Sequence, residues 1–174
     1  IDQSFQLALL ARYADAPTIN RPDILHGALQ AMIARGSCRA FQDKPVPVDL
    51  VDVLCATALA APTKSDLQQR DIILLQSQSV RQRLADLVGD QAWVADAPMI
   101  AVFCGNNRRQ RLLHEWHDIP FANDHFDAVF NSVGDAAIAL GAFVTAAEAV
   151  GLGCRPISAV RNEAGAVSKL LNLP

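Results

Sequence analysis

The spacing of apolar residues predicts a chain rich in helices. Apolar side chains recur at intervals of three or four residues, the period at which they share one face of an α-helix. The pattern fills five stretches: 5–13, 24–33, 50–59, 78–88 and 163–171. The second ends near Gly36, and the third stops before Pro62, as expected because proline disfavours a helical residue before it.

Two short runs of β-branched and aliphatic residues predict buried strands, at Asp71–Leu75 and Met99–Cys104. A third segment, Cys154–Val160, is predicted to be a strand or an extended connection. The polar stretch Gly105–Asp124 carries two adjacent asparagines, several basic residues and most of the histidines. It predicts a mobile excursion.

A long apolar segment begins at Phe126. Seven apolar residues alternate steps of four and three, which places them on one face of a helix: Phe126, Phe130, Val133, Ala137, Leu140, Val144 and Ala147. Its other sides are mostly Ala, Ile or Phe, so we expect it to be buried on several sides. Four polar residues interrupt the run and argue against a membrane span: Asp127, Asn131, Asp135 and Glu148.

The length of 174 residues favours one domain over 1–174, with residues 1–24 as an N-terminal helical extension. The net charge of -3 argues against a nucleic-acid partner, which requires a basic surface. The four cysteines are widely spaced and no secretory signal is visible, which favours a reducing, cytoplasmic compartment. Charged residues make up only 19%, and this low share predicts extra buried surface such as a subunit interface.

The most informative cluster of polar residues is Arg35-Gly36-Ser37-Cys38-Arg39, where a helix is predicted to end. Two guanidinium groups and a hydroxyl can converge on a phosphate, because arginine offers a planar fork of donors. The alternative is a solvated helix end, with cations placed favourably against the helix dipole.

A second polar loop, Pro62–Gln69, concentrates hydroxyl and amide side chains. Such groups can contact the polar edge of a planar heterocycle, since an amide both donates and accepts hydrogen bonds. The alternative is ordinary loop composition.

Other candidate motifs are weaker. The histidines of His114-Glu115-Trp116-His117 are three residues apart, whereas the metalloprotease motif places them four apart, so we expect no metal site. Cys38 lies between two arginines, so it is either a reactive thiol or a small filler residue. Gly151-Leu152-Gly153 follows a helix and precedes an extended segment, the reverse of the order in a dinucleotide fingerprint.

Taken in order, several short motifs resemble the flavin-dependent nitroreductase family, especially its branch of oxygen-insensitive NADPH nitroreductases and flavin reductases. The resemblance runs from about Leu29 to Pro174. Its carriers are Arg35–Phe41 with Pro45-Val46-Pro47, Ala61-Pro62-Thr63 through Gln68, Gly89-Asp90-Gln91, Ala97-Pro98, Ala146–Gly153, Arg161-Asn162 and Val167–Pro174.

The resemblance implies an α+β fold, in which helices surround a mostly antiparallel central sheet. It also implies an intertwined homodimer with one FMN at each subunit interface. The apolar helix from Phe126 to Val150 would be the central dimer helix. The family usually continues beyond the final Leu170–Pro174 motif with another strand and a basic tail, so we expect this chain to lack them.

Carried over position by position, the resemblance assigns ten cofactor-binding residues and no catalytic side chain or metal. Arg35, Ser37 and Arg39 match positions that hold the FMN phosphate and ribityl chain. Thr63 and Gln68 match loop positions near the flavin, and Gln91 matches a ribityl or ring contact. The segment of Pro156, Ile157, Ser158 and Ala159 matches the one that runs along the flavin ring.

The implied activity is hydride transfer from NAD(P)H to FMN and then reduction of a nitroaromatic, a quinone or free flavin. Neither a membrane nor a nucleic acid is expected as a partner. Gly36 and Asp66 depart from common family residues, and they motivate an alternative: a catalytically degenerate flavin-binding or interaction module on the same fold. Dehalogenation or flavin breakdown on this scaffold also stays open, because fold does not fix function.

Overall fold

The computed structural model describes residues 3–17, 27–89 and 91–173. The helices are α1 (Gln3–Leu10), α2 (Gly27–Ala34), α3 (Val48–Leu59), α4 (Gln78–Leu87), α5 (Trp93–Asp96), α6 (Arg108–Trp116), α7 (Phe126–Ala149) and α8 (Ala164–Leu171). Short 3-10 turns lie at η2 (Lys64–Asp66) and η3 (Ala159–Arg161), and the strands are β1 (Arg70–Leu75) and β2 (Ile100–Gly105). The fold is therefore α+β with a helical majority, as the resemblance implies.

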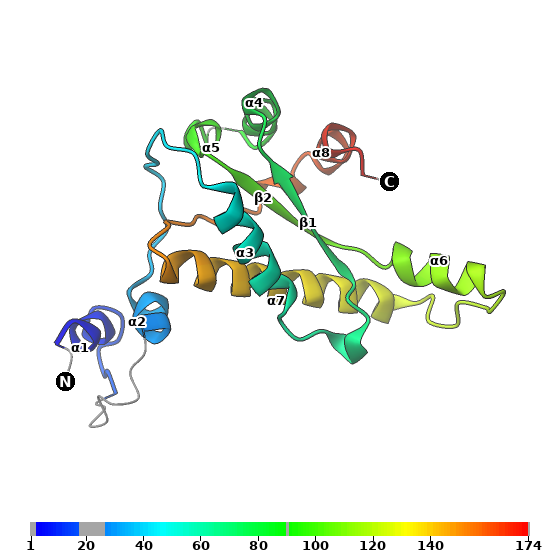
Figure 1. The fold of residues 1–174 in the computed structure, drawn as a ribbon, viewed down its shortest axis with the longest axis horizontal. Coiled ribbons are helices and arrows are strands. Elements are labelled where there is room, and N and C mark those ends of the chain that lie inside the picture. The colour runs from blue at the N-terminus through cyan, green and yellow to red at the C-terminus, as the bar shows by residue number, and fades with distance from the viewer. Residues whose placement is uncertain (1–2, 18–26, 90, 174) are drawn as a thin grey trace.

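A small antiparallel sheet separates two helical layers. β1 pairs with β2 in a register that sets Ile72 opposite Phe103 and Ile73 opposite Val102. Side chains alternate between the faces of a strand, so Ile72 and Phe103 pack with α3 and α7, whereas Ile73 and Val102 pack with α4 and α8. Figure 1 shows α7 lying across one side of the sheet and α4 and α8 on the other.

The core between the sheet and α7 combines large and small apolar side chains. Leu54 and Ala58 of α3 are buried against Phe143 and Ala147 of α7, and the ring of Phe143 meets that of Phe103 edge to face at 5.5 Å. At the end of β2, a Cβ on Gly105 would lie 2.8 Å from the backbone carbon of Ser132 in α7. Glycine at this position allows the strand to approach the helix.

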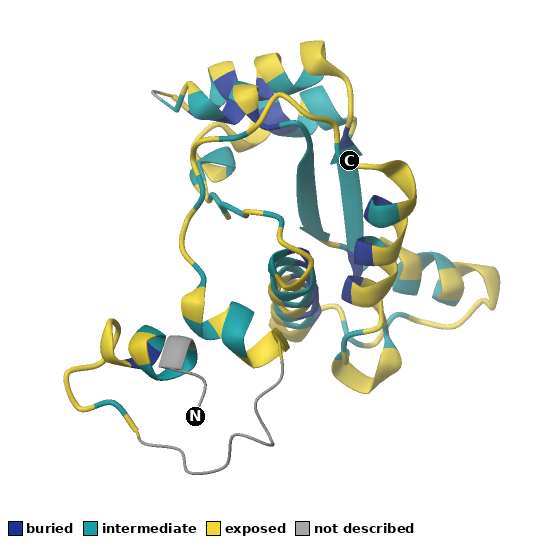
Figure 2. Cartoon of the chain, turned by 60° about the vertical axis from the view of Figure 1, so that its left-hand side comes forward, coloured by how far each residue is buried: buried dark blue, intermediate teal, exposed yellow. Residues whose placement is uncertain are grey.

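The two N-terminal helices form an arm beside these layers. α1 packs on α2, and α2 packs on α7. Figure 2 shows the arm standing away from the sheet, with most of its described residues exposed. The predicted helix 5–13 corresponds to α1, while Ile24 and Leu25 of the next predicted helix lie outside the described residues.

The prediction of a mobile excursion at Gly105–Asp124 is wrong, because this stretch contains the nine-residue helix α6. Contacts of its polar side chains link this helix to the segment that follows it. The guanidinium of Arg111 lies 4.7 Å above the ring of Phe121 and pairs with Asp124, and His114 meets the same ring edge to face. The segment Cys154–Val160 is extended without pairing as a strand, and its end turns into η3.

The prediction that α7 is buried on several sides is met by only part of the helix. Its buried residues are Ala128, Ser132, Asp135, Ala136, Ala139, Phe143 and Ala147. Phe126, Phe130 and Val133, on the predicted apolar face, are 74%, 64% and 60% exposed. By length and composition α7 also suits a membrane span, but here it packs on α2, α3 and both strands as a core helix. Its first half leaves an apolar face uncovered.

Candidate functional site

The arginine-rich motif follows α2 and contacts the last turn of α7. The Nε of Arg35 donates to both carboxylate oxygens of Glu148, at 3.1 and 3.0 Å. The Glu148 side chain is 9% exposed and that of Arg35 is 33% exposed, so this ion pair is partly desolvated. Charge-assisted hydrogen bonds of this kind are stronger than neutral ones. Arg35 therefore anchors the motif to α7.

Cys38 joins the motif to the segment after α7. Its backbone N–H donates to the carbonyl of Cys154 at 3.1 Å, and its thiol donates to the carbonyl of Ala40 at 3.3 Å. A Cβ on Gly153 would lie 2.8 Å from both the Cβ and the Sγ of Cys38. Such a contact is too close for ordinary packing, so only glycine permits this approach of the two segments.

Trp93 brings a third segment to the same region. Its ring lies 6.3 Å from that of Phe41, and the guanidinium of Arg155 lies 5.9 Å above it. Ile157 and Ala159 pack in the apolar cluster that contains Trp93. Gln91, just before α5, is held by a bond from its Nε2 to the carbonyl of Val88 at 3.3 Å.

These contacts unite most of the predicted site, which we call the arginine cluster: Arg35, Ser37, Arg39, Gln91, Pro156, Ile157, Ser158 and Ala159. Ser37 and Arg39 are exposed, and neither has a side-chain hydrogen bond or ion pair with another described residue. A guanidinium and a hydroxyl without internal partners are available to an anion. The arginine cluster therefore offers donors to a phosphate or carboxylate.

The other two predicted residues, Thr63 and Gln68, lie apart from the arginine cluster. They belong to the loop of residues 62–69, which we call the flavin-loop candidate. Ser65, Asp66 and Gln68 in it have φ of 51°, 55° and 53°. Residues other than glycine rarely adopt this left-handed backbone conformation, which costs on the order of 1–3 kcal/mol per residue. The loop therefore needs restraint from its surroundings.

One restraint comes from α7. Asp135 is 2% exposed, and its carboxylate oxygens accept from the backbone N–H groups of Lys64 and Gln69, each at 3.0 Å. The Oγ1 of Thr63 is buried without a hydrogen-bond partner among the described residues. Thr63 also lines a cavity of about 340 Å³ together with Phe130 and Asp135.

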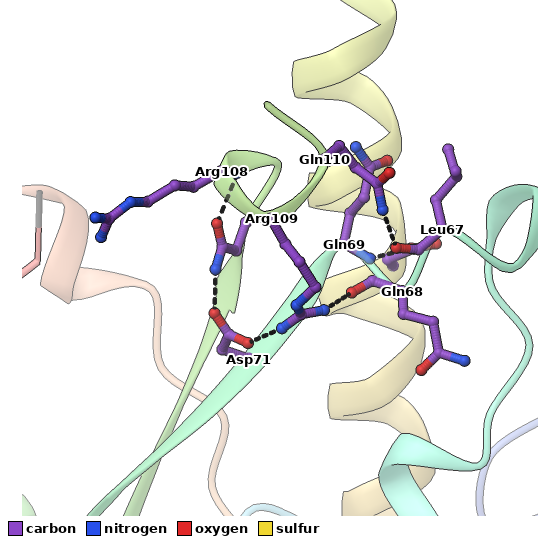
Figure 3. A network of polar contacts seen from close by, with 9 residues as sticks. Leu67, Gln68, Gln69, Asp71, Arg108, Arg109 and Gln110 are labelled. Atoms are coloured by element: carbon purple, nitrogen blue, oxygen red, sulfur yellow. Dashed lines mark hydrogen bonds and ion pairs between the residues drawn. The ribbon is translucent and has the colours of Figure 1, made fainter. Parts of the chain in front are cut away.

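The other restraint comes from α6 and the end of β2. Arg109 donates to the carbonyl of Gln68 at 2.7 Å and to the carboxylate of Asp71 at 2.9 Å, so it reaches across the loop (Figure 3). Gln110 donates to the carbonyl of Leu67 at 2.7 Å. In Figure 3, Arg108 points away from this network.

Two clusters of predicted site residues therefore lie at different places along α7. The arginine cluster is fixed at Glu148 and the flavin-loop candidate at Asp135. At about 1.5 Å of rise per residue, these two anchors are about 20 Å apart along the helix axis. The structure of a single chain does not bring Thr63 and Gln68 to the other eight predicted residues.

Metal-ligating and thiol side chains are the remaining candidates for a further reactive site. No three His, Cys, Asp or Glu side chains within the described ranges are grouped so that they could hold a metal ion. Burial and the nearby carboxylate of Glu148 raise the pKa of the Cys154 thiol from 9.0 to about 11. Burial likewise raises the pKa of Cys55 and Cys104. These three thiols stay protonated at neutral pH and are poor nucleophiles.

Sequence reasoning missed Asp135, Arg109 and Gln110 as supports of a site. A signal for Asp135 existed, because a carboxylate inside an apolar helix requires a hydrogen-bonding partner when it is buried. Arg109 and Gln110 gave no such signal, since polar residues in a polar stretch are expected to face water. Their contacts depend on where α6 lies.

Comparisons with known proteins show the family of the chain. The profile of the Nitroreductase family matches residues 32–174, so the chain belongs to this family. It is 31% identical over 152 residues to an FMN reductase [NAD(P)H] of Bacillus subtilis, and 30% identical over 146 residues to an oxygen-insensitive NADPH nitroreductase of Salmonella typhimurium. The two alignments cover 86% and 84% of this chain.

Solved structures show the same similarity. NfrA2 of B. megaterium superposes with a TM-score of 0.83 at 31% identity, covering 86% of this chain and 61% of that one. The NADPH:FMN oxidoreductase of Vibrio harveyi, solved with NAD+, gives a TM-score of 0.79 at 28% identity and covers 86% and 63%. The chain spans 61% of the length of the Bacillus FMN reductase and 59% of that of the Salmonella nitroreductase.

Proposed function

We propose that the protein is an FMN-dependent NAD(P)H oxidoreductase of nitroreductase type. The observation that carries the proposal is the arginine cluster, in which Ser37 and Arg39 present donors that no other described residue binds, in a chain of this family. Relatives named as NAD(P)H-dependent FMN reductases and nitroreductases support the choice of cofactor and electron donor.

The residues fit FMN by their chemistry. Arg39 and Ser37 supply a charged and a neutral donor, which suit the phosphate. Pro156 and Ile157 lie outside any helix or strand, so their peptide groups can bond to the polar edge of the ring, whereas the carbonyls of Ser158 and Ala159 accept from the N–H groups of Arg161 and Asn162. Arg35 is paired with Glu148, so its part in binding is to position the motif.

The protein's role in the reaction is to bind and orient. FMN, when bound, supplies the two-electron chemistry between NAD(P)H and the acceptor. The arginine cluster holds the phosphate end, and the segment 156–159 fixes the plane of the ring. No described side chain of the arginine cluster is a candidate acid or base, consistent with chemistry that the cofactor carries.

We further propose that the chain works as a homodimer, because the two clusters are separated within one copy. A second copy packed on the exposed face of α7 would cover Phe126, Phe130 and Val133, an apolar patch of the kind that marks interfaces. It would also bring its own residues Thr63 and Gln68 toward the arginine cluster of the first. Each site would then draw residues from both copies.

The acceptor class follows from the cofactor: a planar nitroaromatic, a quinone or free flavin. A cytoplasmic location suits the four free cysteines among the described residues. Both statements extend what the relatives' names say to this chain.

The visible absorption spectrum of the purified protein, with released cofactor identified by mass, tests the proposal. A flavin spectrum, FMN by mass and NAD(P)H oxidation that depends on a nitro compound or quinone are expected. A protein that stays colourless after FMN is added would contradict it and favour a degenerate module.

A further inference from the structure

A buried carboxylate outside the arginine cluster has two backbone donors and no side-chain partner among the described residues. The Oδ1 of Asp135 accepts from the N–H of Lys64 and its Oδ2 from the N–H of Gln69, each at 3.0 Å. A carboxylate that is 2% exposed is costly to bury unless such bonds compensate it. Asp135 therefore clamps both ends of one short loop to α7.

The clamped loop is also held from its opposite side. Gln110 binds the carbonyl of Leu67 and Arg109 that of Gln68, while the N–H of Asn106 donates to the carbonyl of Gln69 at 2.9 Å. Amides are thus fixed by α7 and carbonyls by α6 and the end of β2 (Figure 3). These hydrogen bonds on both sides hold Ser65, Asp66 and Gln68 in their left-handed backbone conformation.

The clamp also fixes the loop to one helix in particular. Asp135 lies two residues after Val133, which is 60% exposed on the apolar face of α7. Asp135 thus ties the loop to the same helix that carries this apolar face. A copy that packs on the face would lie near Thr63, which lines a cavity together with Phe130.

We propose that Asp135 is a positioning residue of the flavin site, an inference that rests on the proposed function. Its carboxylate sets where the loop 62–69 lies, and so where the polar groups of Thr63 and Gln68 stand relative to the ring. Asp135 is buried and both of its carboxylate oxygens accept from loop amides, so it acts through the loop.

The decisive variant is Asp135→Asn, with Asp49→Asn as control. Asparagine keeps the shape but faces one backbone N–H with an NH₂ group, so one of the two bonds is lost. Asp49 is an exposed residue in the first turn of α3, outside both clusters. Arg109→Ala is the companion variant, because Arg109 is 48% exposed and its loss spares the core.

The first measurement is amide hydrogen exchange on the flavin-free chain, which tests the clamp without any cofactor. We expect whichever of the Lys64 and Gln69 amides faces the new NH₂ group to exchange about tenfold faster in Asp135→Asn, since its bond to a charged group is lost. Amides of α3 and all amides of Asp49→Asn should be unchanged. Unchanged exchange at Lys64 and Gln69 would overturn the clamp.

The second measurement uses the FMN-loaded protein with a quinone as acceptor. In Asp135→Asn we expect the KM for quinone to rise about tenfold and the visible flavin band to shift, with kcat per bound flavin within about twofold of wild type. Arg109→Ala should raise KM in the same direction, by about threefold, as expected for a half-exposed contact. A purely structural residue would lower the folded fraction and leave KM and the band of the folded molecules unchanged.

The outcomes separate the two proposals. Faster exchange together with a changed KM and band supports positioning. Faster exchange with an unchanged KM and band in both variants overturns it, while the proposed function stands. A wild-type chain that takes up no flavin overturns the proposed function, and the role of Asp135 in a flavin site with it.

Discussion

The arginine cluster and the flavin-loop candidate show two ways of building a binding region. The arginine cluster joins three extended or turning segments through close contacts: Cys38 on Gly153, Phe41 on Trp93 and Arg35 on Glu148. No residue of the loop 62–69 belongs to the apolar clusters of the described residues; the loop donates hydrogen bonds to Asp135 and accepts them from Arg109 and Gln110. Packing fixes the first region, and directional bonds fix the second.

This difference has a consequence for function. Close packing around Gly153 holds two segments of the arginine cluster together, and its donors Ser37 and Arg39 are exposed. The loop depends on a few polar bonds, and therefore it is the region that a single substitution can move without disturbing the core. In the proposed dimer, the closely packed arginine cluster of one copy would face the hydrogen-bonded loop 62–69 of the other.

The strongest test of the two-cluster arrangement is Val133→Asp. A carboxylate on the exposed apolar face of α7 should weaken a dimer by about 2–4 kcal/mol, the range of a central interface residue. Because Val133 is 60% exposed in the single chain, the fold of the monomer should be kept. Sedimentation should show monomers, and flavin titration should show weaker binding of FMN. An unaltered dimer would mean that the interface lies elsewhere.

Arg39→Ala tests the arginine cluster alone. Loss of a charged hydrogen bond to phosphate should lower FMN affinity by about 1.5–3 kcal/mol, as measured by fluorescence titration. Arg108→Ala is the matched control, since Arg108 is exposed on α6 and points away from the polar network (Figure 3). If Arg39→Ala binds FMN as wild type does, the phosphate assignment is wrong.

Gly153→Ala tests whether packing holds the arginine cluster. The new Cβ would lie 2.8 Å from the Cβ of Cys38, so the two segments must separate. The expected loss in the free energy of unfolding is about 1–3 kcal/mol, the usual cost of overpacking. In contrast, Gly165→Ala in α8 meets nothing within 4 Å and should leave stability equal or higher in the same urea titration.

The smallest expected effect is a loss of stability at alkaline pH through Cys154. Burial raises its pKa to about 11 in the folded chain, against 9.0 for an unperturbed thiol. The protonated form is thus favoured by folding, so its stabilising contribution is full below pH 9.0 and is lost as the pH rises toward about 11. Cys154→Ala should flatten the fall in unfolding free energy over this range, and an equally steep fall would assign it to other groups.

Most elements were predictable because their apolar residues repeat with the period of the element that buries them. The runs at 71–75 and 99–104 became β1 and β2, and the repeats before and after them became α3, α4 and α8. α6 could not be predicted in this way. Its position depends on Arg109 reaching Asp71 and on Gln110 reaching Leu67, contacts between residues far apart in the chain.

Residue type and local spacing are enough to indicate the family, the helical pattern and the donors of the arginine motif. The pairing of Arg35 with Glu148, the clamp of Asp135 on the loop 62–69 and the separation of the predicted site residues along α7 depend on the folded chain. Hydrogen bonds and buried charges depend on the position of both partners in space. A pattern along the chain specifies one partner, and the fold supplies the other.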